Sequence, residues 1–134
     1  MKRKFVIDTS VYITYAAYNK IYRLIYAIHN YELRVFVNDE LLEELENNIA
    51  DCLRIKDADP AILMHAIKSA TIHVITQPNY NKSPDPKDNF LFDLALQTES
   101  EVIVTQEKVL LSFTSSPVPI HNIKWFKENF PVPL

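Results

Sequence analysis

The stretch that decides the fold is Lys4-Phe5-Val6-Ile7-Asp8-Thr9-Ser10, close to the start of the chain. Its apolar part, residues 4–7, is the first segment able to form a buried strand. Asp8 then places an acid where that strand gives way to a helix, and a charge in such a place is costly unless something there uses it. In open α/β sheets, ligands bind outside the carboxyl ends of the strands. Asp8 is therefore the first candidate for a functional residue.

The composition is that of a globular protein. The chain has 134 residues, 48% of them hydrophobic and 23% charged, so we expect one domain spanning residues 1–134 with an ordinary core. A single cysteine, Cys52, cannot form an internal disulfide, and Asp8 interrupts the apolar run that a signal peptide would need. These two features predict a cytoplasmic protein. No stretch approaches the roughly 18 apolar residues of a membrane span, so no membrane association is expected.

Glycine is absent from the sequence, although average usage would give roughly nine. This excludes the glycine-rich loops that bind nucleotide phosphates, and no nucleotide cofactor is expected. The net charge of -3 provides no overall basic field for a nucleic acid. Any chemistry on phosphate groups must therefore rely on another kind of binding site.

Apolar segments that suit strands alternate with helical patterns along the chain. Strands are predicted at residues 4–7, 33–37, 72–76, 101–105 and 118–120. Helices are predicted over residues 11–30, from Asn38 or Asp39 to about Arg54, from Asp59-Pro60 onward, from Asp85 to Thr98, and over residues 108–112 and 122–130. This alternation predicts an α/β fold of three layers, α/β/α, with a mainly parallel central sheet of four to five strands.

Two acids follow predicted strands. Asp8 comes directly after the first strand, and Glu107 comes two residues after the fourth. Both fall on the side of a parallel sheet where ligands bind. Each also has a plainer explanation, because Asp8 can cap the next helix and Glu107 can be a solvated residue at a helix start. Thr9 or Ser10 could cap equally well, which favours a function for Asp8.

Two further candidate acids lie on predicted helices. Asp88 shares one helix face with Leu91 and Ala95, and a carboxylate on a buried face calls for a cation. Asp88 also suits the first turn of a helix for purely structural reasons. Glu44 and Glu46 flank the apolar stripe of an acidic helix, and periodicity does not choose between them.

Together these acids predict a site for a hard cation. Carboxylates and hydroxyls without clustered histidine or cysteine suit Mg²⁺ or Mn²⁺ rather than zinc. The four histidines are scattered and lack ligand spacing: His29, His65, His73 and His121. A bound divalent ion can polarise a phosphoryl oxygen and activate water, so a phosphodiester hydrolase follows naturally.

Four blocks of the sequence, in their order and spacing, resemble the PIN-domain family, in particular the PIN-type toxin components of bacterial toxin–antitoxin systems. The blocks are Phe5-Val6-Ile7-Asp8-Thr9-Ser10, Val37-Asn38-Asp39-Glu40-Leu41-Leu42-Glu43-Glu44-Leu45, Asp85-Pro86-Lys87-Asp88-Asn89 through Leu94-Ala95, and Val102-Ile103-Val104-Thr105-Gln106-Glu107-Lys108-Val109-Leu110-Leu111. The resemblance covers nearly the whole chain, and it selects Glu44 over Glu46 as the acid of the second block.

The resemblance implies a metal-dependent ribonuclease with a compact α/β/α fold. Its catalytic and metal-binding acids would be Asp8, Glu44, Asp88 and Glu107, with Mg²⁺ or Mn²⁺ as cofactor and Thr9, Ser10 or Thr105 orienting water. The implied partners are an RNA substrate, a cognate antitoxin protein and a second copy of the chain in a homodimer. Lys87 and Lys108 are near enough in sequence to the acids to touch substrate phosphates, although exposed solubilising lysines explain them equally.

The fourth block departs from the family pattern. Gln106 stands for the usual glycine, Glu107 for the first aspartate and Val109 for the second. Because Val109 removes an acid, a catalytically impaired PIN-like module that binds RNA or protein is the alternative. A phosphotransferase with an aspartate nucleophile also places Asp after its first strand, but its second acid would fall on Ser10 here.

The predicted first long helix carries a stripe of tyrosines, Tyr15, Tyr18, Tyr22 and Tyr26, with Tyr12 nearby. Core packing with the hydroxyls at the rim is the preferred interpretation for most of them. A groove for an antitoxin or a second protomer is the other.

Overall fold

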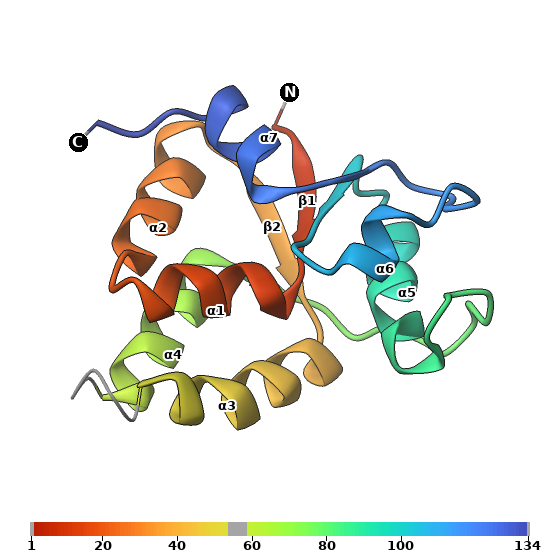
Figure 1. Ribbon diagram of the computed structural model, residues 1–134, viewed down its shortest axis with the longest axis horizontal. Coiled ribbons are helices and arrows are strands. Elements are labelled where there is room, and N and C mark those ends of the chain that lie inside the picture. The colour runs from red at the N-terminus through yellow and green to blue at the C-terminus, as the bar shows by residue number, and fades with distance from the viewer. Residues whose placement is uncertain (1, 54–58, 134) are drawn as a thin grey trace.

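The computed structural model describes residues 2–53 and 59–133 (Figure 1). Its strands are β1 (Lys4–Ile7), β2 (Arg34–Val37), β3 (Ile72–His73), β4 (Val102–Val104) and β5 (Ile120–His121). Its α-helices are α1 (Thr9–Ala17), α2 (Ile21–Asn30), α3 (Asp39–Leu53), α4 (Pro60–Ala70), α5 (Asn89–Gln97), α6 (Lys108–Leu111) and α7 (Ile123–Asn129), and η1 (Pro86–Asp88) is a 3-10 helix. The predicted alternation of strands and helices is confirmed.

All pairs of neighbouring strands in the sheet are parallel, in the order β3-β2-β1-β4-β5. The chain therefore builds outward from β1 in one direction through β2 and β3, and in the other through β4 and β5. Ile7 of β1 pairs with Val104 of β4, so Asp8 and Thr105 leave the sheet side by side. A reversal of strand order at this place opens a crevice at the carboxyl ends of the strands.

Helices cover both faces of the sheet. In Figure 1, α1, α2 and α4 lie to the left of β1 and β2, and α5 and α6 lie to the right. The middle strands are apolar without alternation, and Phe5, Val6 and Ile7 are all 0% exposed, as expected for a parallel sheet covered on both sides. The predicted three-layer α/β/α fold is confirmed.

The predicted single helix over residues 11–30 is wrong, because the chain turns between α1 and α2. Asn19 has a positive φ of 55°, a conformation that asparagine tolerates better than most residues. The amide of Lys20 donates to the carbonyl of Tyr15 at 2.8 Å, and that of Asn19 to Ala16 at 2.9 Å. These two bonds form a Schellman motif, which ends a helix.

The tyrosine stripe divides between core and surface. Tyr12 and Tyr15 are buried, whereas Tyr18, Tyr22 and Tyr26 are 69%, 61% and 44% exposed. The prediction of core packing is therefore right for the first two and wrong for the other three. Tyr18 lies at the end of α1, and Tyr22 and Tyr26 lie on α2, whose direction the turn at Asn19 changes.

Several predicted boundaries shift. The third strand is shorter than predicted, since β3 covers only Ile72–His73, and β5 begins two residues later than predicted, at Ile120. The predicted helix from Asp85 begins instead as the 3-10 helix η1 before α5. The predicted end of the second predicted helix, at about Arg54, lies outside the described residues; this helix is α3 in the structure. Within residues 2–53 and 59–133, no helix is long and apolar enough to cross a membrane.

Candidate metal centre

Asp8 is 1% exposed and lies at the junction of β1 and α1. Its Oδ1 accepts a hydrogen bond from the Thr9 amide at 2.8 Å, so Asp8 caps the helix. Its Oδ2 accepts from the hydroxyls of Ser10 and Thr105, both at 2.8 Å. Hydrogen bonds to an ionised acceptor are the strong ones, and these three hold the buried carboxylate in one orientation.

The loop after β4 fixes the two hydroxyls from the other side. The amide of Gln106 donates to Ser10 Oγ at 3.0 Å, and the amide of Glu107 donates to Thr105 Oγ1 at 3.1 Å. A hydroxyl oxygen that accepts in this way keeps its own hydrogen for another acceptor, which here is Asp8. This network ties the loop to Asp8 and places the Glu107 side chain beside it.

Glu44 reaches the same place from α3, which packs against α1. Burial raises the pKa of Glu44, the Thr9 hydroxyl lowers it, and the negative charge of Asp8 raises it again. Thr9 Oγ1 is itself buried and has no hydrogen bond of good geometry within the described chain. By contrast, Glu46 is exposed, so packing separates the two glutamates that periodicity could not.

Asp88, which is 8% exposed, ends η1. Burial raises the pKa of Asp88 to about 6, and three nearby acids, Asp8, Asp85 and Glu44, add to the effect. Burial likewise raises the pKa of Glu107 to about 7, with further contributions from Asp8, Asp88 and Glu44. A hydrogen bond between these two side chains lowers the pKa of Asp88 and raises that of Glu107. Of the two carboxyls, Glu107 is therefore the one whose pKa is raised further.

The four acids thus come from four parts of the chain to one edge of the sheet. Two observations make a hard cation a good fit: every available ligand atom is an oxygen, and Thr9 Oγ1 is buried with no hydrogen bond of good geometry among the described residues. Glu44 and Glu107 also line a hollow of about 610 Å³ together with Thr9 and Ser10. In the part of the chain that the structure describes, however, no three acidic, histidine or cysteine side chains are positioned to hold one ion as they stand.

The remaining sequence candidates lie outside this cluster. Lys87 and Lys108 are exposed, and their contact with substrate stays a prediction. His73 pairs with Asp39 at 2.7 Å on the surface, and the ring of His121 stacks on Trp125.

One buried acid, Asp93, is not singled out by the sequence, and Asn38, a predicted helix start, is a buried cap. Asp93 accepts from the amides of Asn79 and Tyr80 at 3.1 and 2.7 Å, and so holds the loop that leads to η1. Asn38, which is 0% exposed, caps α3 by accepting from the Leu41 amide at 3.0 Å. The signal for Asp93 was its isolation in an apolar helix, where a lone acid needs a partner.

Comparison with known proteins agrees with this architecture. No curated protein matches the sequence. Among solved structures, the fold is similar to the crystal structure of PAE2754 from Pyrobaculum aerophilum, with a TM-score of 0.64 and 16% sequence identity, over 96% of this chain and 89% of that chain. At this identity the likeness shows the fold alone. The sequence also matches the PIN domain model over residues 4–108. Because this match spans most of the chain, the protein belongs to the PIN domain family, a superfamily of nucleases.

Proposed function

We propose that this protein is a ribonuclease that requires Mg²⁺ or Mn²⁺ and hydrolyses RNA phosphodiester bonds. The observation that carries the proposal is the gathering of Asp8, Glu44, Asp88 and Glu107 at the carboxyl ends of β1 and β4. Burial and then the charges of the neighbouring acids raise the pKa of Glu44, Asp88 and Glu107, and a cation would relieve the repulsion between these charges. Membership of the PIN family supports nuclease chemistry.

In this proposal Asp8, Glu44 and Asp88 hold the ion, and Glu107 completes the site or holds a second ion. When bound, the ion stabilises charge on the phosphoryl oxygens and lowers the pKa of water. Ser10 and Thr105 keep the Asp8 carboxylate from rotating, as hydrogen-bonded neighbours of metal ligands do. The Thr9 hydroxyl, which has no hydrogen bond of good geometry among the described residues, is available to orient water or substrate.

Cleavage of a labelled single-stranded RNA in Mg²⁺ or Mn²⁺ tests the proposal. Asp8→Asn keeps the shape of the side chain and removes its charge, so we expect a loss of rate of about 100-fold or more. Glu44→Gln and Glu46→Gln form a matched pair, in which only the first should slow cleavage. Equal rates for wild type and Asp8→Asn, or full activity in EDTA, would remove the proposed function.

A non-catalytic binding module is the second candidate. It is favoured by Val109, which is 51% exposed where the family usually has an aspartate, and by the lack of three described acids positioned around one point. RNA binding that is the same with and without Mn²⁺, and without cleavage, would support this alternative. An increase in cleavage on Val109→Asp would instead show an enzyme weakened by the missing acid.

For the biological setting, we propose a toxin that is neutralised by an antitoxin protein and acts as a homodimer. The support is the resemblance of the sequence blocks to PIN-type toxins. Expression of the wild type should arrest bacterial growth, and Asp8→Asn should not. Normal growth with an enzyme that cleaves RNA in vitro would contradict the toxin role and leave the nuclease proposal intact.

A further inference from the structure

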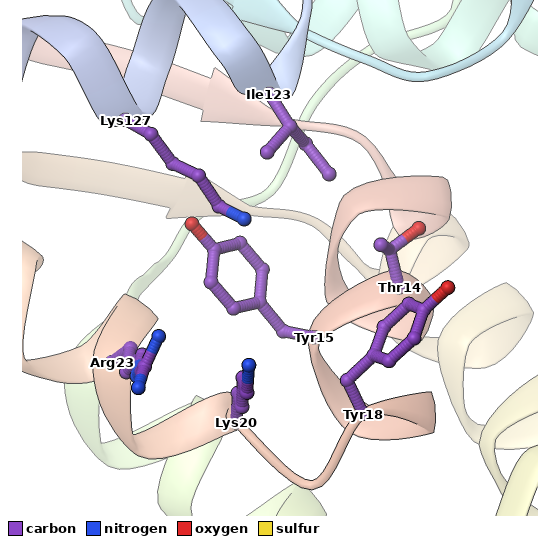
Figure 2. A pocket seen from close by; sticks show the side chains of 7 residues that line it. All are labelled: Thr14, Tyr15, Tyr18, Lys20, Arg23, Ile123 and Lys127. Atoms are coloured by element: carbon purple, nitrogen blue, oxygen red, sulfur yellow. The ribbon is translucent and has the colours of Figure 1, made fainter. Parts of the chain in front are cut away.

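A small pocket of about 210 Å³ lies where the end of α1 meets the start of α2 and α7 (Figure 2). Its polar lining is Thr14, Tyr15, Tyr18, Lys20, Arg23 and Lys127. Three of these residues are cations and none is an acid, although the chain as a whole has a net charge of -3. A local field of opposite sign to the whole molecule attracts anions.

Among the residues that the structure describes, the three cations have no anionic partner. Neither Lys20, Arg23 nor Lys127 forms an ion pair within the described ranges, and Arg23 Nε is buried with no hydrogen-bond acceptor there. Figure 2 shows their nitrogen ends arranged around the Tyr15 ring, with Lys127 Nζ 5.5 Å from its centroid. Like charges repel, and a buried donor without an acceptor is costly. A bound anion would reduce the repulsion and supply the missing acceptor.

The hydroxyl groups of the pocket suit a phosphate. Burial raises the pKa of Tyr15 to about 12, and Arg23 lowers it, so the phenol is a donor at neutral pH. The pocket is also smaller than the roughly 300–1,000 Å³ of typical small-molecule sites. Its size and its donors therefore favour a phosphate group over a whole nucleotide.

The pocket borders a second hollow, with which it shares Ile123 and Lys127. This neighbouring hollow of about 500 Å³ is lined by Gln106, Asn122, Lys124, Lys127 and Glu128, of which Lys124 and Glu128 form an ion pair at 4.0 Å. Gln106 belongs to the Asp8 network, because its amide donates to Ser10 Oγ. Along α1, Ser10 and Tyr18 are separated by roughly 12 Å at the usual helical rise. A polyanion a few units long can therefore reach from the acids to the pocket over a surface that carries lysines.

We propose that this pocket binds a backbone phosphate of the RNA strand whose scissile bond lies at the acids, a few nucleotides away. Tyr18, which is 69% exposed at the pocket, stacks on a base beside that phosphate. The inference rests on the proposed function, since it assigns a second contact with the same substrate. An acidic protein segment is the other conceivable occupant, but the small volume and the link to Gln106 favour the RNA backbone.

The test is fluorescence anisotropy of a labelled single-stranded RNA in EDTA, where binding is measured without cleavage. The pocket variant is Lys20→Gln with Lys127→Gln. The control, Lys2→Gln with Lys68→Gln, removes the same charge from exposed lysines elsewhere. We expect the pocket variant to bind about tenfold more weakly, with a log–log salt slope smaller by about 0.7, while the control changes by less than about twofold. Arg23→Gln should resemble the pocket variant.

Equal affinities for the pocket variant and the control would overturn the inference. Poly-glutamate that displaces the labelled RNA as strongly as unlabelled RNA does would also overturn it, because the pocket would then be a binding site for an acidic protein. Circular dichroism and the stability of Arg23→Gln separate a lost contact from a lost fold. The proposed function is judged on cleavage and this inference on binding in EDTA, so the failure of one is distinguishable from the failure of the other.

Discussion

At Asp8 a helix cap and a candidate metal ligand are the same side chain. Oδ1 accepts from the backbone of α1, and Oδ2 accepts from Ser10 and Thr105. The structural and the functional explanations of this acid are therefore compatible. A carboxylate fixed by the backbone on one side and by two hydroxyls on the other is already oriented before any ligand arrives.

Thr105 should contribute strongly to this arrangement. It is 0% exposed, donates to Asp8 and accepts from the Glu107 amide. Thr105→Val keeps the shape, removes one of the two hydroxyls that donate to Asp8 Oδ2 and leaves the Glu107 amide without its acceptor. The free energy of unfolding should therefore fall by about 1–3 kcal/mol. Thr105→Ser keeps the hydroxyl and should lower the free energy of unfolding by less. Urea unfolding of the three proteins measures this, and equal losses for both variants would contradict it.

The raised pKa values of Asp88 and Glu107 predict how the metal-free protein responds to pH. The folded state keeps a proton on Glu107 up to about pH 7, whereas the unfolded state loses it near the ordinary value of 4.5. This stabilising contribution is complete below pH 4.5 and is lost as the pH rises toward 7. Urea unfolding in EDTA should therefore show a free energy of unfolding that falls over this range.

Two comparisons isolate the cause of this pH dependence. Glu107→Gln should make it shallower, because one titrating group is gone. Mg²⁺ should raise stability most at the upper end of the range, since cations bind the ionised acids. A slope that is unchanged in Glu107→Gln would assign the effect to other groups.

The choice between Glu44 and Glu46 shows what the sequence of one helix cannot contain. Both glutamates flank the same apolar stripe, and only the family resemblance selected Glu44. The deciding fact is the packing of α3 against α1, which brings Glu44 to Thr9 and Asp8 and leaves Glu46 in solvent. This contact joins two different helices, so the periodicity of one helix cannot predict it.

At the scale of the elements, three helices end in the same way without glycine. Asn19, Glu32 and Glu99 follow α1, α2 and α5 with φ values of 55°, 52° and 58°. In each case the next amide bonds back to the last turn, as Ser100 does to Ala95 at 2.8 Å. Left-handed backbone costs a residue with a Cβ roughly 1–2 kcal/mol, so the two glutamates are strained.

Glu99→Gly should therefore stabilise the protein. Removing the Cβ relieves the left-handed residue, and we expect a gain of about 1 kcal/mol in the free energy of unfolding, measured by urea denaturation. The same substitution in the middle of α3, Glu43→Gly, should instead lose about 1 kcal/mol. A loss in both variants would show that Glu99 is stabilised by contacts of its side chain.

The local apolar patterns, and the absence of glycine, explain which elements could be predicted from the sequence. Strands β1, β2 and β4 are short apolar runs that no helical pattern mimics, and they were placed within about one residue. The break between α1 and α2 was missed because apolar spacing continues through Asn19. In a chain without glycine, the usual marker of a helix end is missing as well.

At the scale of the whole molecule, the order of the strands creates the site. Asp8 and Thr105 are distant in sequence, yet the pairing of β1 with β4 makes them neighbours. The sequence predicted that both lie at carboxyl ends of strands, but the alternation of elements does not fix the strand order. The basic pocket was beyond prediction for the same reason, since α1, α2 and α7 meet there only in the folded chain (Figure 2).

Calorimetric titration of Mn²⁺ into the protein at pH 7.5 tests the central claim, that the acids around Asp8 form a metal centre. We predict saturable binding that Asp88→Asn weakens by about tenfold or more, and that Asp39→Asn, on the exposed start of α3, changes by less than about twofold. Equal affinity in Asp88→Asn and wild type, or no binding by the wild type at millimolar Mn²⁺, would contradict the claim.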